Sequence, residues 1–245
     1  MSTEGSTGPV DDGPESPEEV ALDFHPQAVR PNFLWTAKLP THWAFLDTHP
    51  SRWKRQLDRI VEEYFAGRRA PAAERRILLR HLEQLVQGAQ NQKVLFTFLM
   101  PGVVREGEVS ACTVFLRWQN SSPTLASLRD LEATFGPSKE LVHYRTGAGD
   151  PYVAFSETGK TGPLTDRRPI FHHQAFVPIP TTTWTLAVAG SAPTEETSQH
   201  VRDVVLRIAN SIRAYPETTG QRILGDPESG ELRSDGTSAV RYVSP

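Results

Sequence analysis

The stretch IFHHQAFVPIPTTTWTLAV, residues 170–188, decides the fold because it encodes two strands and the turn between them. Apolar and aromatic residues are frequent on both sides of a Pro-Thr-Thr-Thr segment at 180–183. In the second half, Trp184, Leu186 and Val188 alternate with smaller residues and share one face. The pattern predicts a hairpin of two strands over 170–179 and 184–188, and a hairpin joins antiparallel neighbours.

Further strands are predicted on the N-terminal side of this hairpin. Residues 140–144 and 152–155 are strand-like and flank the turn sequence Gly-Ala-Gly-Asp-Pro at 147–151, which predicts a second hairpin. Residues 94–100 and 109–118 are apolar in both alternating sets, which is typical of strands covered on both faces. An additional strand is predicted at 32–38.

Two helices are predicted between residues 51 and 90. Trp53, Leu57 and Val61 belong to an apolar stripe with helical spacing, with Ser51 as the expected N-cap and Gly67 as the expected end. A second stripe follows Pro71 and ends near Gly88. The arginines on the opposite faces are interspersed with acids, which favours a solvated helical hairpin, although a surface for an anionic partner remains open.

Two more helices complete the pattern. Leu128, Leu131 and Phe135 predict a helix within 123–135, capped by Thr124 and ended by Gly136. The last helix is predicted to begin near Thr194, with two acids in its first turn, where the helix dipole favours them.

The order of these elements predicts an α+β fold. Hairpin connections imply a largely antiparallel sheet, and helices on both of its faces make it a three-layer α/β/α sandwich with disordered termini. We expect three regions: an acidic disordered tail at 1–30, a single domain at 31–215 with the helical hairpin 51–90, and a polar C-terminal tail at 216–245. Residues 1–29 carry seven acids and no Lys or Arg, and 239–243 predict a short terminal strand.

Four short motifs resemble the PsbP-like superfamily. LWTAKLPTHW at 34–43 is similar to its opening strand, and FVPIP at 176–180, WTLAVAG at 184–190 and IANSI at 208–212 are similar to its closing strands and helix. Photosystem PsbP subunits, Ran-binding Mog proteins, LpqN lipoproteins and DcrB-like effector chaperones share this α/β/α fold. The resemblance implies a non-enzymatic binder that docks proteins on its sheet or loops. The sequence departs from the family by its 51–90 hairpin and by lacking a lipobox cysteine and a transit peptide.

Composition and the absence of long apolar segments indicate where in the cell the protein is found. The single cysteine, Cys112, excludes an internal disulfide and cysteine-based zinc modules. The N-terminus lacks the basic and apolar segments of a signal peptide, and the longest nearly apolar run, 94–104, is about half of the roughly 20 residues that a membrane helix needs. Arginine outnumbers lysine 21 to 5, which is typical of a GC-rich genome. We therefore expect a cytoplasmic bacterial protein without membrane insertion.

No residue pattern indicates catalysis. The Gly-Lys-Thr sequence at 159–161 resembles a phosphate-binding loop, but Ala154 stands where that loop needs glycine, so a flexible loop is the simpler interpretation. His172 and His173 are adjacent on a strand and point to opposite faces, so they cannot share a metal ion. We expect one buried, hydrogen-bonded histidine and one surface histidine, no metal, no cofactor and no enzymatic activity.

The candidate partner-binding residues are Arg117, Trp118, Arg167, Arg168 and His172. An arginine and an aromatic residue at the end of a strand are typical of interface hot spots, although Trp118 shares a face with Val114 and Leu116 and packing in the core is the alternative. The acidic net charge of -3 disfavours a nucleic-acid partner.

These observations predict a cytoplasmic adaptor or chaperone-like module that binds another protein. An immunity protein is an equally admissible binder. The alternatives are a structural subunit of a larger assembly, including a homo-oligomer, and a small-ligand receptor or enzyme with a pocket near His172 or His143.

Overall fold

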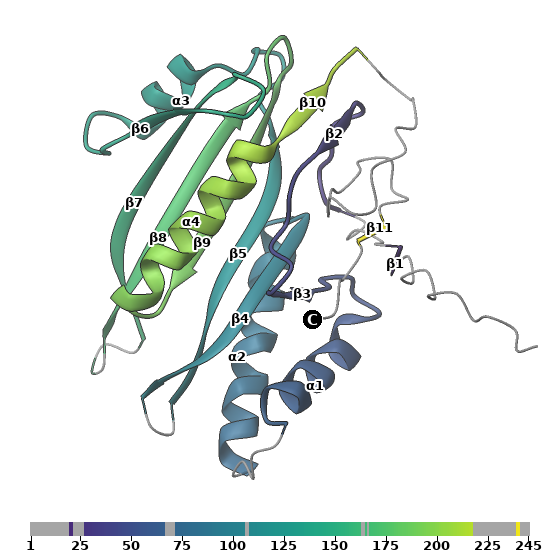
Figure 1. Ribbon diagram of the computed structural model, residues 1–245, viewed down its shortest axis with the longest axis vertical. Coiled ribbons are helices and arrows are strands. Elements are labelled where there is room, and N and C mark those ends of the chain that lie inside the picture. The colour runs from purple at the N-terminus through teal and green to yellow at the C-terminus, as the bar shows by residue number, and fades with distance from the viewer. Residues whose placement is uncertain are drawn as a thin grey trace, which may run out of the picture.

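Seven strands form one antiparallel sheet in the order β3-β4-β5-β9-β8-β7-β6 (Figure 1). The computed structural model describes residues 20–21, 27–66, 72–105, 108–162, 165, 167–217 and 239–240. The strands of the sheet are β3 (Ala44–Leu46), β4 (Phe96–Arg105), β5 (Glu108–Asn120), β6 (Val142–Arg145), β7 (Pro151–Thr161), β8 (Arg168–Pro178) and β9 (Trp184–Ala192).

The predicted hairpins are confirmed. β8 pairs with β9 and β6 pairs with β7, both antiparallel, across the turns predicted from their Pro, Thr, Gly and Asp residues. β7 is longer than predicted and reaches Thr161, because β8 pairs with it as far as Arg168. Consequently Gly159, Lys160 and Thr161 lie in a strand and not in the flexible loop that we expected.

One face of the sheet carries α4 (Glu195–Ser211), which buries the predicted stripe of Val201, Val205 and Ile208 against the sheet. Beside it, β2 (Leu34–Thr36) pairs with β10 (Arg213–Tyr215) in a separate two-stranded sheet, so the predicted strand at 32–38 lies outside the large sheet. The helix approaches the sheet closely at Gly190, where an added Cβ would lie 2.5 Å from a methyl group of Val201.

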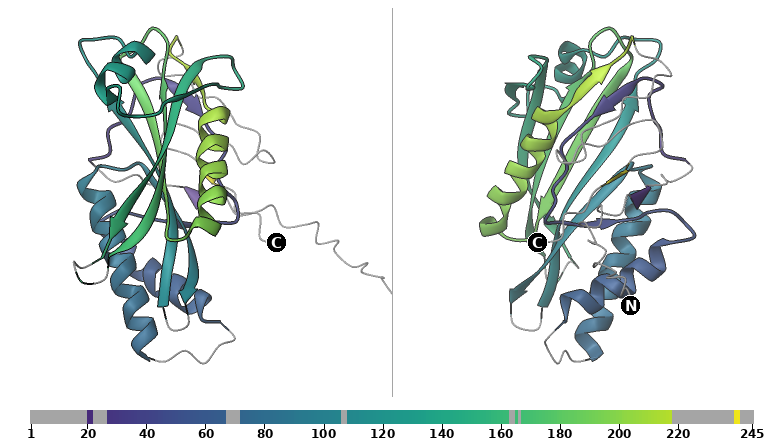
Figure 2. Two further views of the ribbon diagram at one scale, coloured as in Figure 1. Left: turned by 90° about the vertical axis from the view of Figure 1, so that its left-hand side faces the viewer. Right: turned by 45° about the vertical axis from the view of Figure 1, so that its right-hand side comes forward.

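The other face is covered at both ends. α1 (Trp53–Tyr64) and α2 (Ala72–Asn91) bury a cluster with Leu46 of β3 and Leu99 of β4. α3 (Leu128–Phe135) packs on a second cluster that includes Phe155 of β7 and Phe176 of β8. Figure 2 shows α2 and α3 on the side of the sheet opposite α4. The middle of this face, formed by β5, β9 and β8, lies between the α1–α2 pair and α3.

Helix ends show where local prediction succeeded and where it failed. Thr194 caps α4 as predicted, since its hydroxyl accepts from the Thr197 amide (3.2 Å), and Gly136 ends α3 with a φ of 70°. The cap of α3 is Ser127 and not Thr124, which lies in the preceding turn. Arg52 and not Ser51 is the N-cap of α1, and no side-chain hydrogen bond caps this helix end.

Other predicted boundaries differ from the structure or lie outside the described residues. α2 continues past Gly88 to Asn91, and the predicted end of α1 at Gly67 lies outside the described residues. Of the two predicted tails, most residues also lie outside the described part, but Val20–Ala21 forms β1 and pairs with β11 (Ala239–Val240). Those two residues therefore form a strand within the region assigned to the acidic tail. No helix in the described part of the chain is both long and apolar enough to cross a membrane.

Candidate partner-binding groove

The uncovered middle of the sheet has a floor of small residues. β9 contributes Ala187, Ala189 and Ser191 to this face. In the registers of the neighbouring strands, Arg117 of β5 lies beside Ala187, and Gln174 of β8 lies beside Ala189. Because the central side chains are short and their neighbours are long, the sheet is hollowed along β9.

Two hollows lie along this floor and share Arg117 and Gln174. The first, of about 280 Å³, lies beside His172 and the end of α2, where Gln92 contributes to the wall. The second, of about 820 Å³, extends from Arg117 toward α3, and Leu125, Asp130 and Phe176 are among the residues that line it. We call the combined hollow the α2–α3 groove.

Arg117 is the charged residue at the centre of the α2–α3 groove. It is half-buried on a central strand of the sheet and lines both hollows. Within the described part of the chain, its guanidinium has no ion-pair or hydrogen-bond partner. A guanidinium presents five donors in a planar fork that fits a carboxylate, so this side chain is arranged to accept an anionic group from outside the fold.

The wall on the α3 side combines apolar and polar groups. Leu125 is 58% exposed at this wall, and Phe176 and Phe135 lie deeper with their ring centroids 4.8 Å apart. Asp130 also lines the groove, but its carboxylate accepts from the Ser127 hydroxyl (2.7 Å) at the helix N-terminus. The groove therefore offers apolar surface next to one cation whose charge is not neutralised locally.

The structure brings two of the five predicted site residues together. Arg117 and His172 line the same hollow. Arg168 is the first residue of β8 and Arg167 precedes it, four to five residues from His172 and outside the lining of the groove. At about 3.3 Å per residue, they lie more than 10 Å along the strand from His172.

Trp118 lies on the opposite face of the sheet. Its side chain is 4% exposed and contacts Phe33, Trp35 and Trp184 edge to face, with centroid distances of 6.1, 5.3 and 6.4 Å. Alternation along β5 explains this position, since Arg117 faces the groove and its neighbour must face the other way. Trp118 is therefore a core residue, as its shared face with Val114 and Leu116 indicated, and it is not available to a partner.

Of the two adjacent histidines, His173 is buried and hydrogen-bonded as predicted, whereas His172 is half-buried and not fully at the surface. His172 is half-buried in the groove, whereas His173 is 7% exposed on the face that carries α4. The His173 ring bonds to the Ser156 hydroxyl through Nδ1 (2.7 Å) and to the Ser198 hydroxyl through Nε2 (2.8 Å). Burial, followed by electrostatic interactions with Arg202 and His172, lowers the pKa of His173, so the ring is neutral near pH 7.

Several residues of the groove were not predicted from the sequence. The alternation along 170–179 places Gln174 and Phe176 on the face of His172, and this signal was present in the sequence. Leu125 and Ser127 carried no such signal, because their place in the wall depends on how α3 packs against β7 and β8.

Two sequence comparisons were made with known proteins, and neither identifies a relative. No protein-family model matches the sequence, and a search of curated proteins finds no match. Among the described residues, no group of three or more His, Cys, Asp or Glu side chains could hold a metal ion.

Proposed function

We propose that this chain is a non-enzymatic protein-binding module, an adaptor or chaperone-like domain, that holds an acidic and partly apolar segment of its partner in the α2–α3 groove. The proposal includes the three-layer α/β/α sandwich of the PsbP-like superfamily and a bacterial, cytoplasmic setting. Helices on both faces of an antiparallel sheet support the first, and the composition supports the second.

Arg117 is the observation that carries this proposal. A half-buried arginine without a carboxylate partner has lost part of its hydration and has gained no ion pair in return. An Asp or Glu side chain of a bound segment restores that interaction through a bidentate hydrogen bond. Charged hydrogen bonds of this kind contribute about 1.5–3 kcal/mol.

The shape of the groove favours a peptide segment. The larger hollow is about 820 Å³ and continues into the smaller one past Arg117, so an elongated occupant can lie across β5, β9 and β8. Leu125, Phe135 and Phe176 supply apolar contacts beside the cation. Arginine surrounded by apolar residues is a common composition of interface hot spots. We assign Arg167 and Arg168 to long-range attraction of the acidic segment, since they lie outside the lining.

A peptide-display selection tests the proposal without knowledge of the natural partner. The full chain is used to select from a random library, in parallel with Arg117→Gln and with Arg129→Gln, an exposed arginine of α3 outside the groove lining. We expect peptides that combine Asp or Glu with large apolar residues, selected by the parent and by Arg129→Gln but not by Arg117→Gln. No enrichment, or enrichment that persists in Arg117→Gln, contradicts the proposal.

The second candidate is a small-ligand receptor or enzyme that uses the hollow of about 280 Å³ beside His172. Its size is near the lower limit of pockets that hold small molecules. The two candidates differ in the effect of filling the larger hollow. Ala126 lines the larger hollow and not the smaller one. Ala126→Trp is therefore expected to prevent peptide binding and to leave the binding of a ligand beside His172 unchanged.

A further inference from the structure

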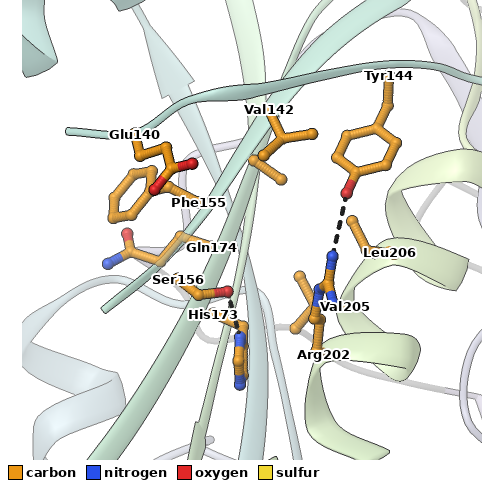
Figure 3. Close-up of a pocket in the computed structure, with 11 residues that line it drawn as sticks. Glu140, Val142, Tyr144, Phe155, Ser156, His173, Gln174, Arg202, Val205 and Leu206 are labelled. Atoms are coloured by element: carbon orange, nitrogen blue, oxygen red, sulfur yellow. Dashed lines mark hydrogen bonds between the residues drawn. The ribbon is translucent and has the colours of Figure 1, made fainter. Parts of the chain in front are cut away.

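A separate pocket lies on the α4 side of the sheet, and we call it the α4–β6 pocket. It forms because β6 ends at Val142, opposite Ala154, while β7 continues to Thr161 and leaves its edge uncovered. α4 contributes Arg202, Val205 and Leu206 to its wall, and the volume is about 280 Å³ (Figure 3). The pocket shares Gln174 with the α2–α3 groove but opens beside α4, so it is a second site.

Arg202 is the charged group at one end of this pocket. It is half-buried, and its Nη2 donates to the Tyr144 hydroxyl at 3.4 Å, a long hydrogen bond. No carboxylate of the described residues forms an ion pair with it. Figure 3 shows its guanidinium directed toward Tyr144 between β6 and α4. Most of the donors of Arg202 are therefore available to an anionic group in the pocket.

Hydrogen bonds between His173 and the hydroxyl groups of Ser156 and Ser198 fix a polar group in the lining of the pocket. The neutral His173 ring donates through one nitrogen and accepts through the other, so its two hydrogen bonds to serine hydroxyls satisfy both. Ser156 and His173 both line the pocket. The imidazole thereby orients the Ser156 hydroxyl, which keeps further hydrogen-bonding capacity for a ligand.

The remaining lining selects against a strongly charged ligand. Val142, Ala154, Val205 and Leu206 form apolar walls. Glu140 lies away from Arg202, on the other side of Val142 in Figure 3, and it repels a second anionic group there. The charge pattern therefore fits a ligand with one acid group, held by Arg202, and an apolar body.

We propose that the α4–β6 pocket binds a small monocarboxylate with a short apolar body. Its carboxylate accepts hydrogen bonds from Arg202 and the Tyr144 hydroxyl, and its body contacts Val142, Val205 and Leu206. Apart from Gln174, no residue that lines this pocket lines the α2–α3 groove.

An NMR titration of the full chain tests this assignment. Hexanoate is the probe, hexanamide is the uncharged control of the same shape, and inorganic phosphate is the anion without an apolar body. Backbone amide shifts of Ser156, Arg202 and Leu206 report on the pocket. We expect saturable shifts at these residues with hexanoate, and at least tenfold weaker binding of hexanamide and phosphate.

Variants identify the group that holds the carboxylate. Arg202→Gln is expected to weaken hexanoate binding at least tenfold, whereas Arg207→Gln, an exposed arginine of α4 outside the pocket, leaves it unchanged. Thermal unfolding of both variants checks that the fold is retained. Equal binding of hexanoate and hexanamide, tighter binding of phosphate, retained binding in a folded Arg202→Gln, or no saturable shift each overturns the proposal.

Discussion

Arg117 and Trp118 are consecutive residues with opposite environments. The alternation of β5 directs Arg117 into the α2–α3 groove and Trp118 into the core beneath α4, β2 and β10. An Arg-Trp pair in a sequence is therefore ambiguous, because only one of its members can belong to a given face. The proposed binding surface lies on the face of the sheet to which Arg117 points.

Trp118 is expected to affect stability and not binding. Trp118→Ala removes edge-to-face contacts with three aromatic rings, and large-to-small changes of this kind cost about 3–5 kcal/mol. Trp118→Phe is expected to be milder, because the buried Nε1 has no hydrogen-bond partner among the described residues. Urea unfolding measures both. A folded Trp118→Phe that no longer binds the selected peptides would contradict the assignment to the core.

His173 predicts a loss of stability in acid. Burial lowers its pKa, as do electrostatic interactions with Arg202 and His172, while the Ser198 hydrogen bond and Asp203 act in the opposite direction. The unfolded chain, with a histidine pKa of about 6.5, therefore binds the proton first as the pH falls. The free energy of unfolding is expected to be constant above about pH 7, to fall through the unfolded pKa and to level off below the native one.

The His173→Gln variant tests this pH dependence. Each unit by which the pKa is lowered contributes about 1.4 kcal/mol to the loss. Burial also lowers the pKa of His81 in α2, so His173→Gln is expected to retain part of the pH dependence. Urea unfolding at pH 7.5 and pH 5 is expected to show a smaller loss for His173→Gln than for the parent. Equal losses would show that His173 is not the responsible group.

Gly190 allows α4 to approach β9 closely. An added Cβ would lie 2.5 Å from Val201 and 2.9 Å from Val205, and both of these side chains are buried. Gly190→Ala is therefore expected to destabilise the fold by about 1–3 kcal/mol through overpacking.

Gly88 in α2 is the matched control for this change. An added Cβ there meets no atom within 4 Å, and alanine favours a helix interior over glycine by about 0.5–1 kcal/mol. Gly88→Ala is expected to stabilise and Gly190→Ala to destabilise in the same thermal unfolding experiment. A Gly190→Ala variant as stable as the parent would contradict the close packing of α4 on β9.

The elements with strong local signals were predictable from the sequence. Alternation and turn residues identified the β6–β7 and β8–β9 hairpins, and the stripe of Val201, Val205 and Ile208 identified α4. The cap of α3 was misplaced because Thr124 and Ser127 are both suitable capping residues and the tertiary contacts of α3 select one of them.

The α2–α3 groove was not predictable from local sequence patterns. It requires β9 to lie between β5 and β8, which are distant in sequence, and it requires the helices to cover only the two ends of one face. Arg117 and His172 were individually identified, but their shared hollow follows from this strand order. The result is a sheet with one face covered by α4 and the β2–β10 pair, and an opposite face that carries α2 and α3 toward its two ends (Figures 1 and 2).

Site-specific photocrosslinking tests most directly whether this open face binds the partner. A benzophenone amino acid replaces Gln119, which lines the groove, or Gln199, which is exposed on α4 and serves as the control. Each protein is irradiated in lysate of its native host. We predict a discrete adduct from position 119 that disappears with Arg117→Gln, and no such adduct from position 199. Adducts from position 199 alone, or adducts from position 119 that persist in Arg117→Gln, would contradict the account.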